Sequence, residues 1–167
     1  MNAVMDPVEI IRRYYAPDSN SYRILLEHGR LVAGKALAAA TRVAAFQPDL
    51  DFIRSAAMLH DIGIFLTDSP GLDCHGSEPY IRHGVLGRVI LDALGHPRHG
   101  LVCERHVGVG ISVEDTRRFS LPLPERDMLP MSIEEQIICY ADKFFSKNGN
   151  ESSREKPVAE IIASLRP

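Results

Sequence analysis

The chain lacks a basic excess and any long apolar run. Nineteen lysines and arginines stand against 22 aspartates and glutamates, giving a net charge of −3. Proteins that bind nucleic acid through its phosphates usually carry a basic excess, so we do not expect nucleic acid as a partner. No apolar run approaches the roughly 20 residues that cross a bilayer, so we expect no membrane partner either.

The sequence also has few cysteines and no secretion signal at its start. Cys74, Cys103 and Cys139 are an odd number, widely spaced, and form no CxxC pair. This excludes a disulfide framework and favours reduced thiols. The first fifteen residues lack a basic segment, a long apolar segment and a small-residue cleavage site. We therefore expect a cytoplasmic protein.

No segment shows the alternating pattern of a β-strand, and apolar residues recur instead at helical spacing. The pattern predicts helices at about 7–15, 21–45, 50–60, 80–94, 97–107, 133–147 and 157–165. With 45% hydrophobic residues, 167 residues can bury a substantial core. The predicted fold class is all-α: one compact domain over residues 1–167, with about six to seven helices and a core at about 22–147.

Local signals mark the ends of these helices and the loops between them. Asp49 is placed to cap one helix, Gly95 to end another, and Ser132 with Glu135 to form a capping box. Residues 62–77 and 108–131 are predicted loops, and 148–156 a polar linker. The long 108–131 segment either closes over a substrate or packs rigidly on the surface.

The pair His60–Asp61, in "AAMLHDIGIF", ends an apolar run where charged groups do not help packing. Imidazole nitrogen and carboxylate oxygen are both good ligands for divalent transition metals. Adjacent helical residues point about 100° apart. We therefore expect the helix to end near Gly63, so that both side chains can face one ion. The alternative is a buried histidine with an aspartate partner.

Further histidines and an aspartate lie in apolar surroundings on other predicted helices. Except for the adjacent pair, successive members are 22 to 36 residues apart, which allows one helix and a turn between them. Helical bundles often build metal centres from side chains on facing helices. Any one of these residues alone could be an ordinary hydrogen-bonded or surface residue. The full set of candidate metal ligands is His28, His60, Asp61, His83, His106 and Asp142.

In this order, H…HD…H…H…D, the chain resembles the HD superfamily of metal-dependent phosphohydrolases, over about residues 22–147. The sequence "HDIG" matches the signature of its HDIG branch. The resemblance implies a helical bundle of the HD-domain type. Because His83 and His106 are present, it also implies the dinuclear subgroup, with Asp61 bridging two divalent ions (Fe, Mn or Zn).

The implied reaction is hydrolysis of a phosphoester or phosphoanhydride in a nucleotide or another small phosphorylated metabolite. Asp61 would be the catalytic residue, holding both ions and the water that they activate. His106 is followed by "VGVGIS" instead of the Gly-Tyr-Pro of relatives that hydrolyse cyclic-di-GMP, which argues against that substrate. Basic residues either hold the phosphate or face solvent; the candidates for substrate binding are Lys35, Arg82, Arg105 and Lys143.

Two other functions stay open at this point. Some HD-fold proteins use a di-iron centre to activate O₂ and oxidise a C–H bond, and the ligands alone do not separate these from hydrolases. A third reading is a sensor that binds metal and nucleotide without catalysis. A homodimer is also open. His75, His96 and His99 are not expected to be ligands.

Overall fold

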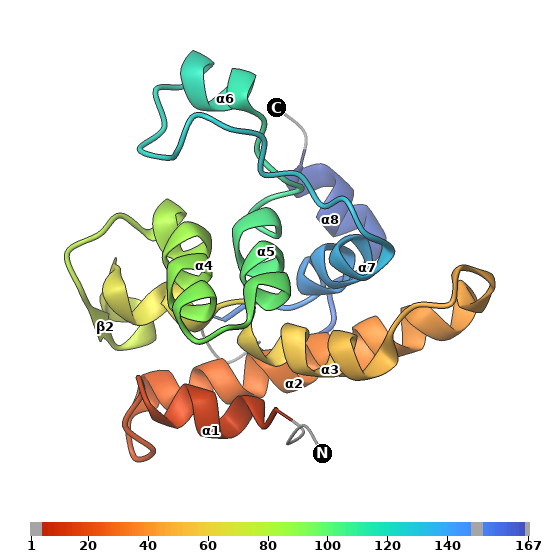
Figure 1. Cartoon of the computed structure of the whole chain (residues 1–167), viewed down its shortest axis with the longest axis horizontal. Coiled ribbons are helices and arrows are strands. Elements are labelled where there is room, and N and C mark those ends of the chain that lie inside the picture. Colours follow the sequence, from red (N-terminus) through yellow and green to blue (C-terminus); the bar gives the residue numbers. More distant parts are fainter. Residues whose placement is uncertain (1–4, 148–151, 166–167) are drawn as a thin grey trace.

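The computed structural model describes residues 5–147 and 152–165, and in this part the predicted all-α fold is confirmed (Figure 1). The described residues form eight α-helices, one more than the upper number expected. The helices are α1 (Pro7–Arg12), α2 (Asn20–Arg42), α3 (Leu50–Leu59), α4 (His83–Ala93), α5 (Pro97–Arg105), α6 (Val113–Arg118), α7 (Ile133–Asp142) and α8 (Val158–Ser164).

Polar side chains begin several helices where the sequence predicts them. The Asp49 carboxylate accepts a hydrogen bond from the Phe52 amide at the start of α3, and the Ser132 hydroxyl accepts one from the Glu135 amide at the start of α7. These bonds satisfy amides that have no partner within the helix. The expected capping box is only half formed. The Glu135 carboxylate accepts instead from the Met131 amide.

The predicted loop 62–77 contains short regular elements that the sequence did not indicate. It consists of η2 (Ile62–Leu66), β1 (Asp68–Ser69), η3 (Pro70–Leu72) and β2 (Cys74–His75), with β1 and β2 paired antiparallel. The expectation of no strand was wrong here because a two-residue strand is too short to show alternation. The short 3₁₀ turn η4 (Tyr80–Arg82) leads directly into α4.

Further boundaries differ from the prediction. The first helix, α1, ends at Arg12 and not near 15. The segment 108–131 contains α6, which begins with a capping box between Ser112 and Asp115. The second helix, α2, ends at Arg42 and not near the predicted 45, and the short 3₁₀ turn η1 (Ala44–Phe46) follows it. The seventh ends at Asp142 and not near 147. Of the predicted linker 148–156, residues 148–151 lie outside the described part.

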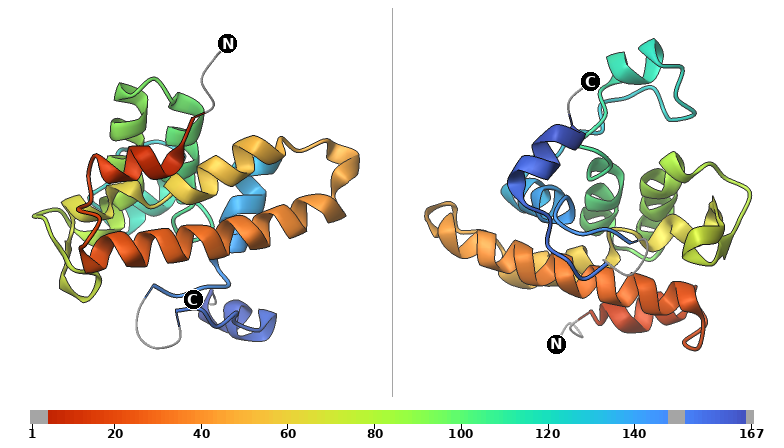
Figure 2. Two further views of the ribbon diagram at one scale, coloured as in Figure 1. Left: turned by 90° about the horizontal axis from the view of Figure 1, so that it is seen from below. Right: turned by 180° about the vertical axis from the view of Figure 1, so that it is seen from behind.

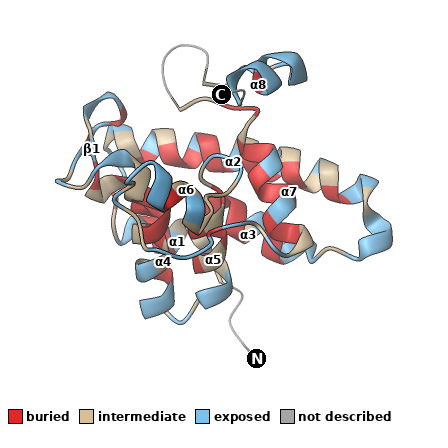
Figure 3. Ribbon diagram, turned by 90° about the horizontal axis from the view of Figure 1, so that it is seen from above, coloured by how far each residue is buried: buried red, intermediate tan, exposed pale blue. Residues whose placement is uncertain are grey.

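The helices pack in two tiers (Figures 1 and 2). The long helix α2 and the shorter α3 lie side by side, and α1 packs beneath them in the view of Figure 1. The helices α4, α5 and α7 lie on the other side of this pair. One apolar cluster joins α2, α3 and α7 around Val32, Ile53 and Ile138; the other surrounds Ile11 and Leu59. Figure 3 shows the buried residues where these helices meet, whereas α6 and α8 are largely exposed. No described helix has the length and apolarity to cross a membrane.

Candidate metal centre

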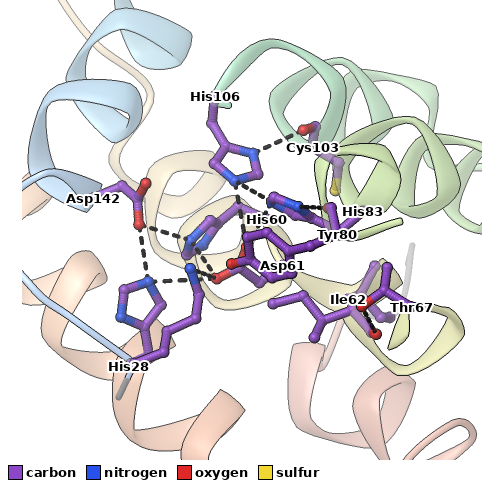
Figure 4. Close-up of polar contacts among 12 residues, drawn as sticks. His28, His60, Asp61, Ile62, Thr67, Tyr80, His83, Cys103, His106 and Asp142 are labelled. Carbon is purple, nitrogen blue, oxygen red and sulfur yellow. Dashed lines mark hydrogen bonds and ion pairs between the residues drawn. The ribbon is translucent and has the colours of Figure 1, made fainter. Parts of the chain in front are cut away.

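The six predicted ligands come together in the interior, from five different helices (Figure 4). His28 lies within α2, His60 follows the last residue of α3, and His83 begins α4. His106 follows the last residue of α5, and Asp142 is the last residue of α7. All six side chains are buried. They form two groups that share Asp61.

The first group contains His28, His60, Asp61 and Asp142. Nε2 of His28 lies 2.9 Å from Oδ1 of Asp142 and 3.4 Å from Oδ2 of Asp61. Nε2 of His60 lies 3.3 Å and 3.1 Å from the same two oxygens. Ligands bound at about 2.0–2.2 Å in a tetrahedron around one ion are separated by similar distances.

The second group contains Asp61, His83 and His106. The two Nε2 atoms are 3.2 Å apart, and each lies 3.3 Å from Oδ1 of Asp61. The carboxylate of Asp61 therefore faces one group with each of its oxygens. This arrangement allows one side chain to contribute to both groups.

Backbone carbonyls set the orientation of three of the histidines. Nδ1 of His60 donates to the Ala57 carbonyl at 2.6 Å, and Nδ1 of His106 donates to the Cys103 carbonyl at 2.7 Å. These carbonyls lie in the last turns of α3 and α5, where they lack helical partners. Nδ1 of His83 donates likewise to a carbonyl three residues earlier, at 2.7 Å. The three Nε2 atoms are then left to face the centre. In metal sites, too, a hydrogen bond from the other ring nitrogen to a carbonyl orients the ligating imidazole.

The centre fits cations better than it fits a metal-free core. A neutral imidazole carries one N–H, so the Nε2 atoms of His83 and His106 face each other with lone pairs at 3.2 Å. Oδ1 of Asp61 and Nε2 of His60 are fully buried and form no hydrogen bond within the described part of the chain. Unpaired buried polar atoms are costly. Cations coordinated by these atoms would remove both penalties.

The turn that carries His60 and Asp61 begins earlier than expected, because α3 ends before these two residues and not near Gly63. The helix ends at Leu59, and Asp61 has φ −105° and ψ 9° before η2 begins. Gly63 does not relax the backbone through a positive φ. It is needed because a Cβ there would lie 2.3 Å from the His83 carbonyl oxygen. Gly63 therefore permits close packing of η2 against α4.

Tyr15 holds this turn, a role that the sequence analysis missed. Its hydroxyl donates to the Ile62 carbonyl at 2.9 Å and accepts from the Phe65 amide at 3.0 Å. Both bonds link Tyr15, in the turn that follows α1, to η2, which lies 47 to 50 residues later in the chain. A tyrosine at the end of an apolar helix is usually interpreted as a core residue. No local sequence pattern indicates that the Tyr15 hydroxyl forms these two long-range hydrogen bonds.

Lys147 is the second residue that the sequence analysis missed. Its Nζ lies 2.8 Å from Oδ2 of Asp61, and its side chain is 14% exposed. Lys143 lies 2.8 Å from the outer oxygen of Asp142 and donates to the His106 carbonyl at 3.3 Å. Because α7 ends at Asp142, the chain turns back and brings Lys147 to the centre. The sequence predicted a helix that continues to 147, and such a helix gives no reason to expect Lys147 beside Asp61.

The other basic candidates all have carboxylate partners. Arg82 pairs with Glu78 at 2.9 Å, and Arg105 pairs with Glu135 at 3.0 Å. Lys35 pairs with Glu155 and lies over the Phe144 ring. Their role in substrate binding remains a prediction.

Burial and neighbouring charges set the protonation of the centre. Burial would raise the pKa of Asp61, but His60 and Lys147 outweigh it and hold that pKa well below its usual range. Burial opposes charge on His60 too, yet Asp61 and Asp142 raise its pKa to about 10. Burial lowers the pKa of His106 to about 4. The ionised Asp61 and the neutral His106 are in the forms that bind metals, whereas His60 would have to give up its proton to a bound cation.

The remaining histidines lie away from the centre. His75 is exposed, 3.4 Å from Asp73, and His99 lies 2.9 Å from the Ser55 hydroxyl. His96 packs beside His99. None belongs to either group of candidate ligands.

The HD domain family model matches residues 25–146, which include all six candidate ligands. The chain belongs to the HD domain family. This confirms the resemblance inferred from the spacing of His28, His60–Asp61, His83, His106 and Asp142.

Among curated proteins, the chain is 38% identical over 107 residues to an uncharacterized protein of Methanocaldococcus jannaschii, covering 64% of this chain and 56% of that one. It is 31% identical to a tRNA (cytidine(56)-2'-O)-methyltransferase of Thermoplasma volcanium, over 83% of this chain and 35% of the enzyme. A protein of that name from Picrophilus torridus is 30% identical, over 59% of this chain and 25% of its own length. The chain thus spans about half or less of these relatives. No solved structure matches it.

Proposed function

We propose that the protein is a metal-dependent phosphohydrolase that holds two divalent transition-metal ions, Fe, Mn or Zn. The observation that carries this proposal is the placement of Asp61. Oδ2 of Asp61 faces His28, His60 and Asp142, and Oδ1 faces His83 and His106. In this proposal His28, His60 and Asp142 would hold the first ion, His83 and His106 would hold the second, and Asp61 would contribute a carboxylate oxygen to each.

Ions at these positions would bind phosphate oxygens and lower the pKa of a coordinated water, the chemistry that phosphoester hydrolysis needs. The protein's own residues prepare the site. The carbonyls of Ala57, Tyr80 and Cys103 keep three imidazoles directed inward. Lys143 holds the outer oxygen of Asp142.

Lys147 is suited to bind the substrate's phosphate. It is a cation directly beside the shared carboxylate, and its side chain also lines two cavities that open next to the centre. A cation aimed at phosphate oxygens stabilises the charge that develops during phosphoryl transfer. We assign Lys147 this role ahead of Arg82, Arg105 and Lys35, whose charges are paired elsewhere.

A nucleotide-like substrate fits the site best. The cavities beside Lys147 have volumes of about 410 and 350 Å³, within the range of about 300–1,000 Å³ for small-molecule sites. Two of the relatives are named for tRNA methylation, which supports a nucleotide component. The buried, reduced cysteines suit the cytoplasm, which we propose as the compartment.

The test reconstitutes the purified protein with Mn, Fe or Zn and measures phosphate release from nucleotides and general phosphoesters, with and without oxygen. We expect release to persist without oxygen and to be lost in Asp61→Asn, while a matched His96→Ala variant keeps it. Oxygen consumption without phosphoester cleavage would instead assign the protein to the oxygenases. Nucleotide binding without turnover would assign it to the sensors.

A further inference from the structure

Two neighbouring cavities share Lys147 as a lining residue. They measure about 410 and 350 Å³, and three residues line both: Gly71, Ser146 and Lys147. The cavities border the metal centre at two places: Lys147, which both share, touches Asp61, and the candidate ligand His28 lines the second cavity. A phosphate held by Lys147 would have space for one substituent in each of the two cavities.

The first cavity, which we call the aromatic arm, is lined by Ser69, Leu72, Tyr80, Phe145 and Lys156. Tyr80 is 40% exposed, and its ring centroid lies 4.5 Å from that of His83 at an interplanar angle of 32°. Flat aromatic surfaces stack on nucleobases regardless of base type. Lys156 adds a positive charge to this arm. The arm therefore suits a nucleoside and tolerates an additional phosphate.

The second cavity, which we call the acidic arm, is lined by Asn20, Ile24, Glu27, His28 and Ser152. Glu27 is on the same helix as His28, one residue earlier, and accepts a hydrogen bond from the Ser152 hydroxyl at 3.5 Å. Apart from Lys147, which both cavities share, this arm has no lysine or arginine among its lining residues. It offers acceptors and donors for hydroxyl groups, and its carboxylate repels a phosphate.

We propose that the substrate is an asymmetric phosphodiester, with a nucleoside in the aromatic arm and an uncharged, hydroxyl-bearing group in the acidic arm. This inference rests on the proposed function. Hydrolysis adds water across one P–O ester bond: the water oxygen joins phosphorus, the ester oxygen leaves with a proton, and the products are a phosphomonoester and an alcohol. A phosphomonoester would leave one arm empty and so lose part of the contact surface.

Glu27 is the residue that determines specificity in this proposal. A charge placed against the wrong ligand gives selectivity even where it contributes little to binding the right one. Two like charges near each other at an exposed site repel by an amount corresponding to about a fivefold change in affinity. Glu27 thus excludes substrates with a terminal phosphate on its side, and Lys156 accepts them on the other.

The test uses phosphorothioate-linked diadenosine, which is cleaved slowly, and its two forms with one added terminal phosphate, at the 5' or the 3' end. Binding to metal-loaded protein is measured by calorimetry. We expect the unphosphorylated probe to bind more tightly than the monoester AMP. One of the phosphorylated probes should bind about fivefold more weakly than the other.

Variants then assign the two arms. Glu27→Gln should remove the penalty on the weak probe and leave the other probe unchanged. Lys156→Gln should weaken only the tolerated probe. Glu114→Gln, an exposed change of the same kind on α6, is the control and should alter neither.

The outcomes separate this inference from the proposed function. Equal binding of both phosphorylated probes, or AMP binding as tightly as the unphosphorylated probe, would overturn the asymmetric diester even if monoesters are hydrolysed. A protein that binds no metal and cleaves no phosphoester would overturn the proposed function itself.

Discussion

The two groups of candidate ligands differ in charge and in access, although they share Asp61. The first group has a second carboxylate, Asp142, two lysines at 2.8 Å from its carboxylates, and a histidine that lines a cavity. The second group has only one oxygen of Asp61 and two imidazoles. Each imidazole is hydrogen-bonded through Nδ1 to a backbone carbonyl three residues earlier. The first group is thus where charges are balanced and where a cavity reaches a candidate ligand, and the second group depends on Asp61 for all its negative charge.

The largest expected effect comes from removing the shared carboxylate. Asp61→Ala takes one ligand from each group and leaves the second group with two neutral imidazoles. We expect metal content, measured by elemental analysis, to fall from about two ions per chain to nearly none. Circular dichroism controls for folding. Retention of one full ion in a folded Asp61→Ala protein would show that the groups do not share this residue.

Single-group variants come next and test whether the groups are separable. His83→Ala or His106→Ala should empty the second site and keep about one ion. His28→Ala or Asp142→Ala should mainly empty the first. Elemental analysis of all four proteins under identical conditions makes the comparison. Loss of both ions in His83→Ala would mean that the second group supports the first, contrary to the difference in charge described above.

A third prediction concerns the packing that holds the second group against the shared residue. In Gly63→Ala the new Cβ would lie 2.3 Å from the His83 carbonyl oxygen and 2.5 Å from the Gly87 amide nitrogen. We expect a loss of about 1–3 kcal/mol in the free energy of unfolding, measured by urea denaturation, with the second ion lost before the first.

The matched control for this variant is Gly34→Ala, within α2. A Cβ there meets no atom within 4 Å, and alanine favours a helix over glycine by about 1 kcal/mol. The control should therefore be neutral or more stable. An equally stable Gly63→Ala protein would contradict the close approach of η2 and α4.

The smallest effects are expected at the histidines outside both groups. His75→Ala, His96→Ala and His99→Ala should leave metal content unchanged, because none of these side chains reaches the centre. If His96→Ala lost metal and His106→Ala did not, the second group would be wrongly composed. Elemental analysis of these variants also sets the background for the larger changes.

The sequence predicted the helices and the candidate ligands well because both depend on local patterns. Apolar periodicity located α2, α3 and α4, and Asp49 marked the start of α3 as predicted. Buried polar residues such as His83 are conspicuous in an apolar helix. Features outside regular periodicity were not predicted: the hairpin of β1 and β2 is too short to show alternation, and α6 interrupts a segment rich in proline and glycine.

The segment 108–131 was left with two interpretations, and the structure supports the rigid one. Arg126 forms an ion pair with the buried Glu104, and Ile111 pairs with Met128 through backbone hydrogen bonds in both directions. Neither arm of the proposed substrate site has a lining residue from this segment. The sequence shows the length of this segment and its proline and glycine content, but not what it packs against.

By itself, the sequence determined the helical class and which six residues are candidate ligands, since helical spacing and unusual polar residues in apolar runs are both written locally. Only the tertiary structure decided that Asp61 faces both groups, that Gly63 serves close packing, and that Lys147 reaches the centre. It also decided that Tyr80 and Glu27, 53 residues apart, line two different cavities that share one lysine. These relations depend on where helices end and how chain segments distant in sequence pack together, and spacing along the chain does not specify either.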